Sequence, residues 1–179
     1  MTDRARFLKI LGCLTLGLFL AIPFLSAQPP AGPNRGVANL TLDGKTISIN
    51  YGRPALKGRD LSNSVAVGTV WRFGMNEATV LKTDADLYTC CGVLKAGSYS
   101  LWAKKVGENK WELIFNSQTG KWGTDHDPLK DLISVPMKVE TSKDSAEQVT
   151  ITLVKTAKGG EIRCAWGTQL LAAEFSNKP

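Results

Sequence analysis

The pattern that most limits the fold is a long series of short, strand-like runs separated by turn residues. In Thr46–Tyr51 and in Gln148–Lys155, apolar and polar residues alternate, which is typical of a half-buried β-strand. No stretch of the sequence keeps helical spacing over three turns. Short strands with frequent turns predict an all-β antiparallel sandwich, jelly-roll-like, whose core comes from alternate residues of both sheets.

Glycine, proline and aspartate mark the ends of the expected strands. Turns are expected at Asp43-Gly44, Asp144–Glu147, Gly159-Gly160 and Gly167-Thr168. Pro136 interrupts one strand, so we expect this strand at a sheet edge or at a bulge. The expected strands are Ala38–Leu42, Thr46–Tyr51, Ala78–Thr83, Leu87–Cys91, Ser98–Lys104, Trp111–Asn116, Leu132–Val139, Gln148–Lys155, Glu161–Trp166 and Gln169–Phe175.

The N-terminal residues have the composition of a secretory signal peptide. Basic residues precede an uncharged apolar run, Ile10–Ile22, and Ser26-Ala27 offers small residues for cleavage. We therefore expect a signal peptide at 1–27, a flexible leader at 28–37 and a single all-β domain at 38–176. Export would place the protein in the periplasm or outside the cell, without a stable membrane span once the peptide is removed. The alternative is an uncleaved anchor, because the apolar stretch approaches the length of a spanning helix.

The charge of the chain argues against nucleic-acid binding. The 179 residues have a formal net charge of +6, of which Arg4, Arg6 and Lys9 against Asp3 contribute +2 in the signal region. The remaining cations are spread along the chain, with no basic run and no aromatic residues interleaved with them. Nucleic-acid-binding proteins concentrate positive charge on one face, so this class is not favoured.

Three cysteines follow the signal region: Cys90, Cys91 and Cys164. An exported protein meets an oxidising environment, so one disulfide is permitted. Adjacent strand residues face opposite sides, so at most one of Cys90 and Cys91 can meet Cys164, and a bond between the two neighbours would strain the backbone. The alternative is three buried or half-buried strand cysteines, and the disulfide state stays open. Zinc is not expected, because no CxxC motif is present and His126 is distant in sequence.

The segment Val70–Thr79 concentrates side chains that suit a site. Trp71 is expected to be buried, with a partner for its indole N–H. Arg72 and Glu77 have opposite charges, and a turn between them would allow them to pair as a structural corner. A second interpretation is a polar pocket for a small anion or sugar-like ligand, lined by Arg72, Asn76 and Glu77. A third makes Glu77 a catalytic acid or base, although no second carboxylate or histidine lies near it in sequence.

Two loops supply further candidates. Arg53 and Arg59 lie in an irregular basic loop, which is expected to be solvated unless one of them reaches the pocket of Glu77. Trp122 lies in the longest expected loop, and is either a lid over the core or a stacking platform for a ring-shaped ligand. The same loop contains Asp125-His126-Asp127. Adjacent side chains point apart in an extended chain, so a solvated turn is preferred to a metal site.

Seven short motifs occur in a fixed order along the chain. They are Tyr51-Gly52-Arg53-Pro54, Lys57-Gly58-Arg59, Gly68-Thr69-Val70-Trp71-Arg72, Asn76-Glu77-Ala78-Thr79, Ala96–Leu101, Ile114-Phe115-Asn116 and Trp122-Gly123. On these motifs the sequence resembles the domain of unknown function 2911 (DUF2911) family of exported bacterial proteins, from Ala38 to Phe175. It departs from the family pattern at Phe73-Gly74-Met75, and the Cys90-Cys91 pair is not typical of the family. The resemblance implies an all-β domain and export, and it implies no activity, because the family is named for lacking one.

The residues favour a binding module for a small ligand that is polar, and either saccharide-like or anionic. No catalytic residue, metal or cofactor is expected, and the oligomeric state is left open. One alternative is an enzyme of hydrolase or isomerase type using Glu77, although no GxSxG, HExxH or Ser-His-Asp order is present. Another is a structural or partner-binding domain that offers a strand edge near Leu132–Val139. The candidate ligand contacts are Arg53, Arg59, Arg72, Asn76, Glu77 and Trp122.

Overall fold

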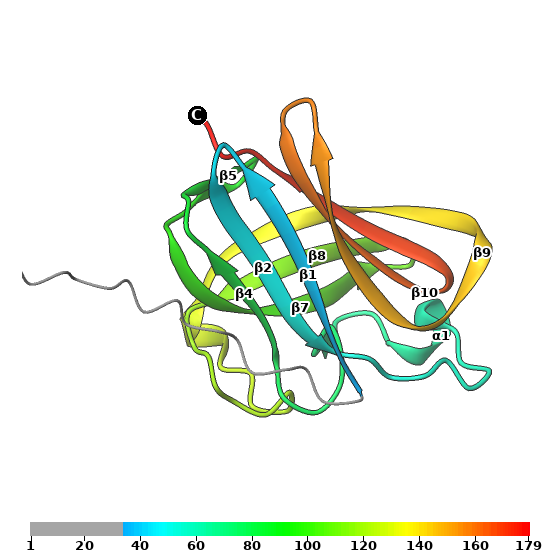
Figure 1. The fold of residues 1–179 in the computed structure, drawn as a ribbon. Helices are drawn as coiled ribbons and strands as arrows, with labels where there is room; N and C mark the ends of the chain where they lie inside the picture. Colours follow the sequence, from blue (N-terminus) through cyan, green and yellow to red (C-terminus); the bar gives the residue numbers. More distant parts are fainter. Residues whose placement is uncertain (1–33) are drawn as a thin grey trace, which may run out of the picture. The chain divides into compact units, whose positions relative to one another are not determined.

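The computed structural model describes residues 34–179, apart from the side chain of Ser62. The expected signal peptide at 1–27 and most of the expected leader lie outside the described residues. Within the described part of the chain, no helix is both long and apolar enough to cross a membrane. The elements are β1 (Arg35–Leu42), β2 (Lys45–Gly52), α1 (Leu61–Ser64), β3 (Val70–Trp71), β4 (Thr79–Thr83), β5 (Leu87–Thr89), β6 (Gly92–Leu94), β7 (Gly97–Gly107), β8 (Lys110–Asn116), the 3-10 helix η1 (Pro128–Lys130), β9 (Asp131–Thr156) and β10 (Gly159–Phe175) (Figure 1).

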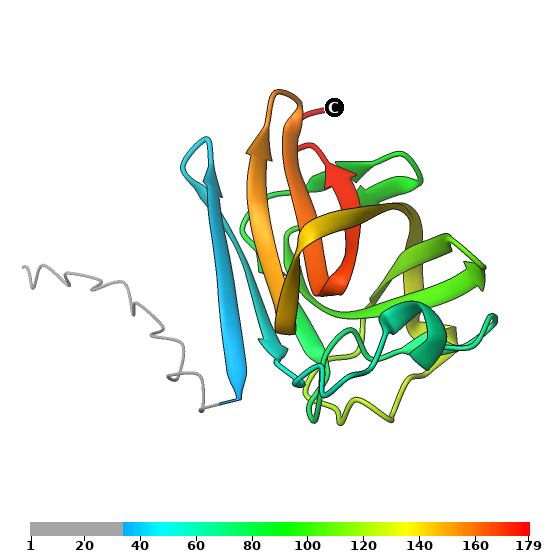
Figure 2. The same ribbon diagram turned by 90° about the vertical axis from the view of Figure 1, so that its right-hand side faces the viewer.

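The main strands form one curled antiparallel sheet (Figures 1 and 2). Its order is β1-β2-β4-β7-β8-β9-β10, with the short β3 paired to β7, while β5 and β6 form a separate hairpin. The sheet nearly closes on itself: Tyr51 of β2 donates a hydrogen bond of 3.2 Å to the carbonyl oxygen of Ile151 in β9. The predicted all-β antiparallel class is confirmed, and the layers expected of a sandwich belong to one continuous sheet.

The main hydrophobic core lies inside the curled sheet. Along the paired strands β7 and β8, side chains alternate between its two faces. Leu101 and Leu113 are fully buried in the main core, whereas Trp102 and Ile114 belong to a small second cluster. The alternation that predicted these strands therefore also explains why a second apolar cluster exists outside the sheet.

The last two strands, β9 and β10, are longer than the sequence predicted. The expected turns at Asp144–Glu147 and Gly167-Thr168 are wrong. Ala146 and Gly167 pair with each other inside the two-stranded ribbon, and the pairing register shifts on both sides of Gly167. Gly167 has a φ of 62°, a left-handed conformation that glycine adopts without steric cost. These turn residues therefore bend both strands together instead of reversing the chain (Figure 1).

The first hairpin confirms one expected turn and corrects one expected boundary. Asp43 and Gly44 join β1 to β2, and both have positive φ, as a tight two-residue turn requires. However, β1 begins at Arg35, so the end of the expected leader at 28–37 is strand. The first residues of β1 pair with the end of β2, which extends the sheet toward the segment that joins β3 to β4.

Pro136 lies where β9 is paired on one side only. It faces Glu112 of β8, whereas the pairing of β9 with β10 stops at Lys138 and Ala172. At this proline β9 therefore has one edge that is not paired with another described strand, as expected, but only over a short length. The β5–β6 hairpin contacts β9 in the same region, which limits the backbone that a partner strand could reach.

Candidate functional site

The corner between β3 and β4 is held in a fixed shape. Phe73 and Asn76 both have positive φ, at 49° and 61°, and the Phe73 side chain is fully buried. The hydroxyl of Thr79 donates a hydrogen bond of 2.8 Å to the Phe73 carbonyl oxygen. A Cβ atom at Gly52 would lie 2.1 Å from the carbonyl oxygen of Met75, so the end of β2 and the corner touch through their backbones. This contact positions the residues on either side of the corner.

An aromatic and cationic stack lies beside the corner. The rings of Trp71 and Trp166 are stacked with centroids 5.8 Å apart, and the guanidinium of Arg59 lies 4.9 Å from the Trp166 ring centroid. Arg59 also donates hydrogen bonds to the carbonyl oxygens of Ala55 and Leu56, at 2.5 and 3.1 Å. Trp71 packs against the core, as predicted, but it stays partly exposed. Arg59 therefore fastens its own loop onto a tryptophan that the sequence did not single out.

Trp71 and Arg72 separate two surface hollows. One hollow, of about 410 Å³, is also lined by Arg59, Met75 and Trp166. The other hollow, of about 320 Å³, is also lined by hydroxyl side chains of α1 and of the following loop, and by His126. Arg72 is half-buried between them. Its guanidinium can therefore serve a ligand in either hollow.

A third hollow, of about 320 Å³, adjoins the first through Pro54, Arg59 and Met75. Arg53 lines this third hollow, and its Nε donates a long hydrogen bond of 3.3 Å to the Val149 carbonyl oxygen. The structure thus brings three of the six predicted contacts into adjoining hollows. We call this surface the arginine groove, defined by Arg53, Arg59 and Arg72.

The arginine groove carries positive charge alone. Its lining includes the three arginines and Lys57, and no aspartate or glutamate of the described chain lines any of the three hollows. Within residues 34–179, Arg72 has no hydrogen bond or ion pair through its side chain. The nitrogens of Arg72 are not among the buried side-chain atoms of the described chain that lack a partner. Its five N–H donors are therefore exposed enough to be available to a ligand.

The predicted pairing of Arg72 with Glu77 is wrong. Glu77 instead accepts a hydrogen bond of 2.9 Å from Arg35 at the start of β1, and the Nε of Arg35 donates to Asn50 at 2.6 Å. Two residues with positive φ, Phe73 and Asn76, lie between Arg72 and Glu77 in the chain. Glu77 is therefore a partner of β1 and does not line the groove.

Asn76 and Trp122 lie beside the groove without lining it. Glu77 and Trp122 form an isolated β-bridge, and the amide of Gly123 donates a hydrogen bond of 2.7 Å to the Asn76 carbonyl oxygen. These bonds fasten the loop that carries Trp122 to the corner. The Trp122 side chain is 47% exposed and lines none of the three hollows, and it is not among the residues of the described hydrophobic core.

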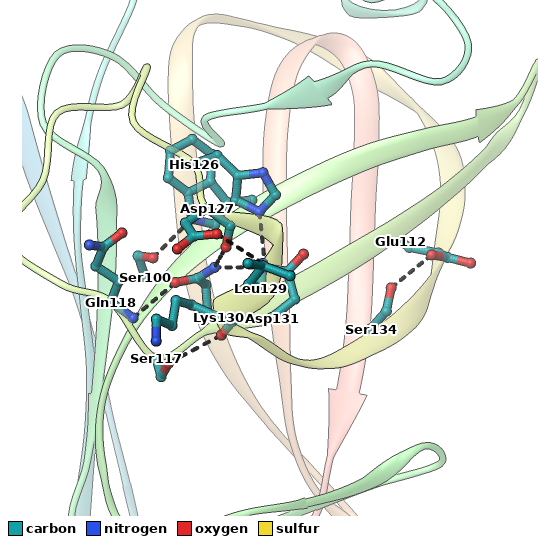
Figure 3. Close-up of polar contacts among 12 residues, drawn as sticks. Ser100, Glu112, Ser117, Gln118, His126, Asp127, Leu129, Lys130, Asp131 and Ser134 are labelled. Atoms are coloured by element: carbon teal, nitrogen blue, oxygen red, sulfur yellow. Dashed lines mark hydrogen bonds and ion pairs between the residues drawn. The ribbon is translucent and has the colours of Figure 1, made fainter.

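His126 is more deeply placed than the sequence predicted (Figure 3). Its ring lies 4.8 Å from the ring of Trp102, and its Nε2 is 2.9 Å from Oδ1 of Asp131, which also accepts a hydrogen bond of 2.7 Å from Asn116. The solvated turn preferred for this residue is therefore wrong. The neighbouring side chain of Asp127 caps η1, so it is directed to a different partner.

The three described cysteines are free thiols. Cys164 is buried in the core, as one sequence interpretation had it, whereas Cys90 and Cys91 occupy the exposed turn between β5 and β6 and not a strand. Among the described residues, no group of three or more histidine, cysteine, aspartate or glutamate side chains is placed to hold a metal ion.

A model of the family described as "Protein of unknown function (DUF2911)" matches residues 33–175. The chain belongs to this family. No match was found among curated proteins or among solved structures. Membership in DUF2911 therefore confirms the resemblance drawn from the seven motifs, but it assigns no ligand or reaction.

Proposed function

We propose that this DUF2911 domain binds a small anionic ligand in the arginine groove, with Arg72 as the central contact. The observation that supports the proposal is Arg72, a half-buried residue that lines two hollows and whose guanidinium has no partner among the described residues. A carboxylate or phosphate can accept two parallel hydrogen bonds from such a group, which gives both affinity and geometric selection.

The composition of the groove favours an anion over a neutral saccharide. Arg53, Lys57 and Arg59 add positive charge around the same hollows, and no carboxylate of the described residues lines them. Trp71 and Trp166 supply apolar surface beside Arg72, which suits a ligand with a ring attached to its anionic group. The proposed ligand class is therefore a ring-bearing carboxylate or phosphate, such as an acidic sugar.

The proposal keeps the exported location expected from the N-terminal sequence. The basic residues and the apolar run of residues 1–27 support export. The arginine groove gives no support to the alternative enzyme that uses Glu77, because Glu77 is paired with Arg35 and lines none of the three hollows.

The test is thermal unfolding and calorimetry with inorganic phosphate, glucuronate and glucose as probes. A ligand at a hundred times its dissociation constant stabilises the folded state by about 2.7 kcal/mol, which raises Tm by several degrees for a domain of this size. We expect glucuronate or phosphate to raise Tm, and glucose to leave it unchanged. A rise in Tm with glucose equal to that with glucuronate would contradict the anionic class.

Two substitutions separate a specific site from general charge. Arg72→Ala is expected to abolish the rise in Tm, and Arg72→Lys to weaken binding, because lysine keeps the charge but loses the planar fork. Lys143→Ala removes the same charge from an exposed position of β9 and is expected to leave binding unchanged. Equal losses in Arg72→Ala and Lys143→Ala would show that only net charge attracts the anion.

A further inference from the structure

A pair of adjacent thiols occupies the turn between β5 and β6. The sulfur atoms of Cys90 and Cys91 lie 3.0 Å apart, and both residues are exposed. Neither residue has a positive φ, so the turn places both side chains without left-handed backbone strain. The two thiols are therefore close together in an ordinary turn conformation.

The turn is fixed by hydrogen bonds from the residue before it. The hydroxyl of Thr89 donates to the carbonyl oxygen of Gly92 at 2.9 Å, and it accepts from the amide of Cys91 at 3.2 Å. Next to it, the backbone of Tyr88 exchanges two hydrogen bonds with Ser176, at 2.7 and 2.8 Å. The thiol pair is thus held in place on the body of the domain, so the entropy of bringing two sulfurs together is already lost in folding.

The third described cysteine behaves differently. Cys164 lies in the core of β10 and is fully buried, and this burial raises the pKa of its thiol. The thiolate is the reactive form and needs access to its reaction partner, so Cys164 is inert in the folded protein. Among the described cysteines, oxidation therefore selects the pair in the exposed turn.

We propose that Cys90 and Cys91 form a reversible redox site, in which a small-molecule disulfide closes the two thiols into a vicinal disulfide and a dithiol reopens it. Closing requires the sulfur atoms to move from 3.0 Å apart to about 2.05 Å, a small displacement for two exposed side chains. A disulfide between adjacent residues strains the backbone, and strained or exposed disulfides are the readily reduced ones.

The reaction proceeds by two exchanges. The thiolate of one of the two turn cysteines attacks one sulfur of the small-molecule disulfide, which forms a mixed disulfide and releases one small thiol. The sulfur of the neighbouring cysteine then attacks the first cysteine's sulfur and releases the second small thiol. In total the protein loses two protons and two electrons, and the small disulfide gains both. Either thiol can attack first, because both are exposed and their sulfur atoms lie 3.0 Å apart in the same turn.

The site also borders a hollow that is separate from the arginine groove. Cys90 lines a cavity of about 270 Å³ together with Tyr88, Pro136, Lys138 and Phe175. Closing the thiol pair removes one S–H group from the wall of this cavity. Oxidation at the turn therefore changes the surface that the cavity presents to a ligand.

The test is peptide mapping of the full chain after equilibration with oxidised glutathione and alkylation of the remaining thiols. Cleavage by trypsin places Cys90 and Cys91 together in the peptide 83–95, away from Cys13 and Cys164. We expect this peptide to escape alkylation and to have lost two hydrogen atoms in most chains, and dithiothreitol to restore two alkylated cysteines. A peptide that stays alkylated, that carries two glutathiones, or that is linked to a second chain would overturn the proposal.

Three variants locate the reaction. Cys90→Ser and Cys91→Ser each leave one exposed thiol, which is expected to hold a single glutathione and never to form the closed peptide. Cys164→Ser is the control, and its closing reaction is expected to be unchanged. Thermal unfolding of each variant checks that the domain remains folded, and both turn substitutions are at exposed positions. A closed peptide in either turn variant would contradict the assignment.

Discussion

The substitution Gly52→Ala tests whether the close contact between β2 and the corner holds the site together. A Cβ atom at Gly52 would lie 2.1 Å from the Met75 carbonyl oxygen and 2.8 Å from its carbonyl carbon, whereas ordinary contacts begin at 3.4 Å. The shortfall of 1.3 Å falls on backbone atoms, which cannot rotate away as a flexible side chain would. Either the end of β2 or the corner must move.

The expected cost follows from this shortfall. Overfilling a packed region costs about 1–3 kcal/mol, and we place Gly52→Ala at the upper end because backbone is displaced. For a domain of this size, about 3 kcal/mol corresponds to a fall in Tm of roughly 9 °C. Because Arg72 lies at the same corner, we also expect weaker binding of the anionic probe.

The measurements are urea unfolding followed by tryptophan fluorescence, and thermal unfolding by circular dichroism. Gly107→Ala is the matched control, because the three atoms nearest to a Cβ atom there belong to the side chain of Lys110, at 3.3–3.5 Å, and none lies closer than 3.0 Å. The free energy of unfolding of the control is expected to lie within about 0.5 kcal/mol of that of the natural protein. If the free energy of unfolding of Gly52→Ala also lies within this margin, the contact with Met75 does not hold the corner.

Two further predictions concern stability. Trp166→Ala is expected to lower the free energy of unfolding in urea by about 3–5 kcal/mol, because Trp166 is 4% exposed and its removal leaves a cavity. Trp122 is 47% exposed, so Trp122→Ala is expected to lower it by less than about 1 kcal/mol. Equal losses in the two variants would refute the burial argument. Hydrogen bonds from lysine side chains lower the pKa values of Asp43, Asp86 and Glu174 in the folded protein. These carboxylates therefore stabilise the fold above their unfolded-state pKa, and this stabilisation is lost as the pH falls through the folded-state pKa. The three pairs lie at the surface, where solvent screens them, so replacing these carboxylates with amides is expected to lessen the fall in the urea midpoint between about pH 6 and pH 3 only slightly. An unchanged fall would show that they contribute nothing.

Turn residues in the sequence predict a change of direction, but they do not tell whether the chain reverses or only bends. Asp43-Gly44 reverses the chain because strands of matching length pair on either side of it. Gly167 has the same left-handed backbone, yet the chain continues as strand because Ala146 already lies opposite it. The difference is a pairing between residues far apart in sequence. Local propensity therefore predicted the all-β class and most strands, but it divided the two longest ones.

The site shows the same limit. Trp71 and Arg72 were predicted from their own segment, since a large aromatic beside a guanidinium is a local feature. Trp166, in contrast, meets Trp71 only because β10 returns across the domain, and no local pattern predicts which tryptophans will stack. Asp125-His126-Asp127 was predicted to be a solvated turn because adjacent side chains point apart in an extended chain. The contacts of His126 with Trp102 and Asp131 depend on how the loop folds over β7, which the sequence pattern does not encode.

The misplaced start of β1 and the mispaired Glu77 have one common cause. Pairing Arg72 with Glu77 was reasonable on spacing alone, because Arg35 was expected in a flexible leader. The structure extends β1 back to Arg35, and this places a cation beside Glu77 that is 42 positions away in sequence. With Glu77 engaged by Arg35, the guanidinium of Arg72 has no ion-pair partner among the described residues and lies between the two hollows. The position of one strand boundary therefore decides whether Arg72 is neutralised by Glu77 or is available to the anion that we propose.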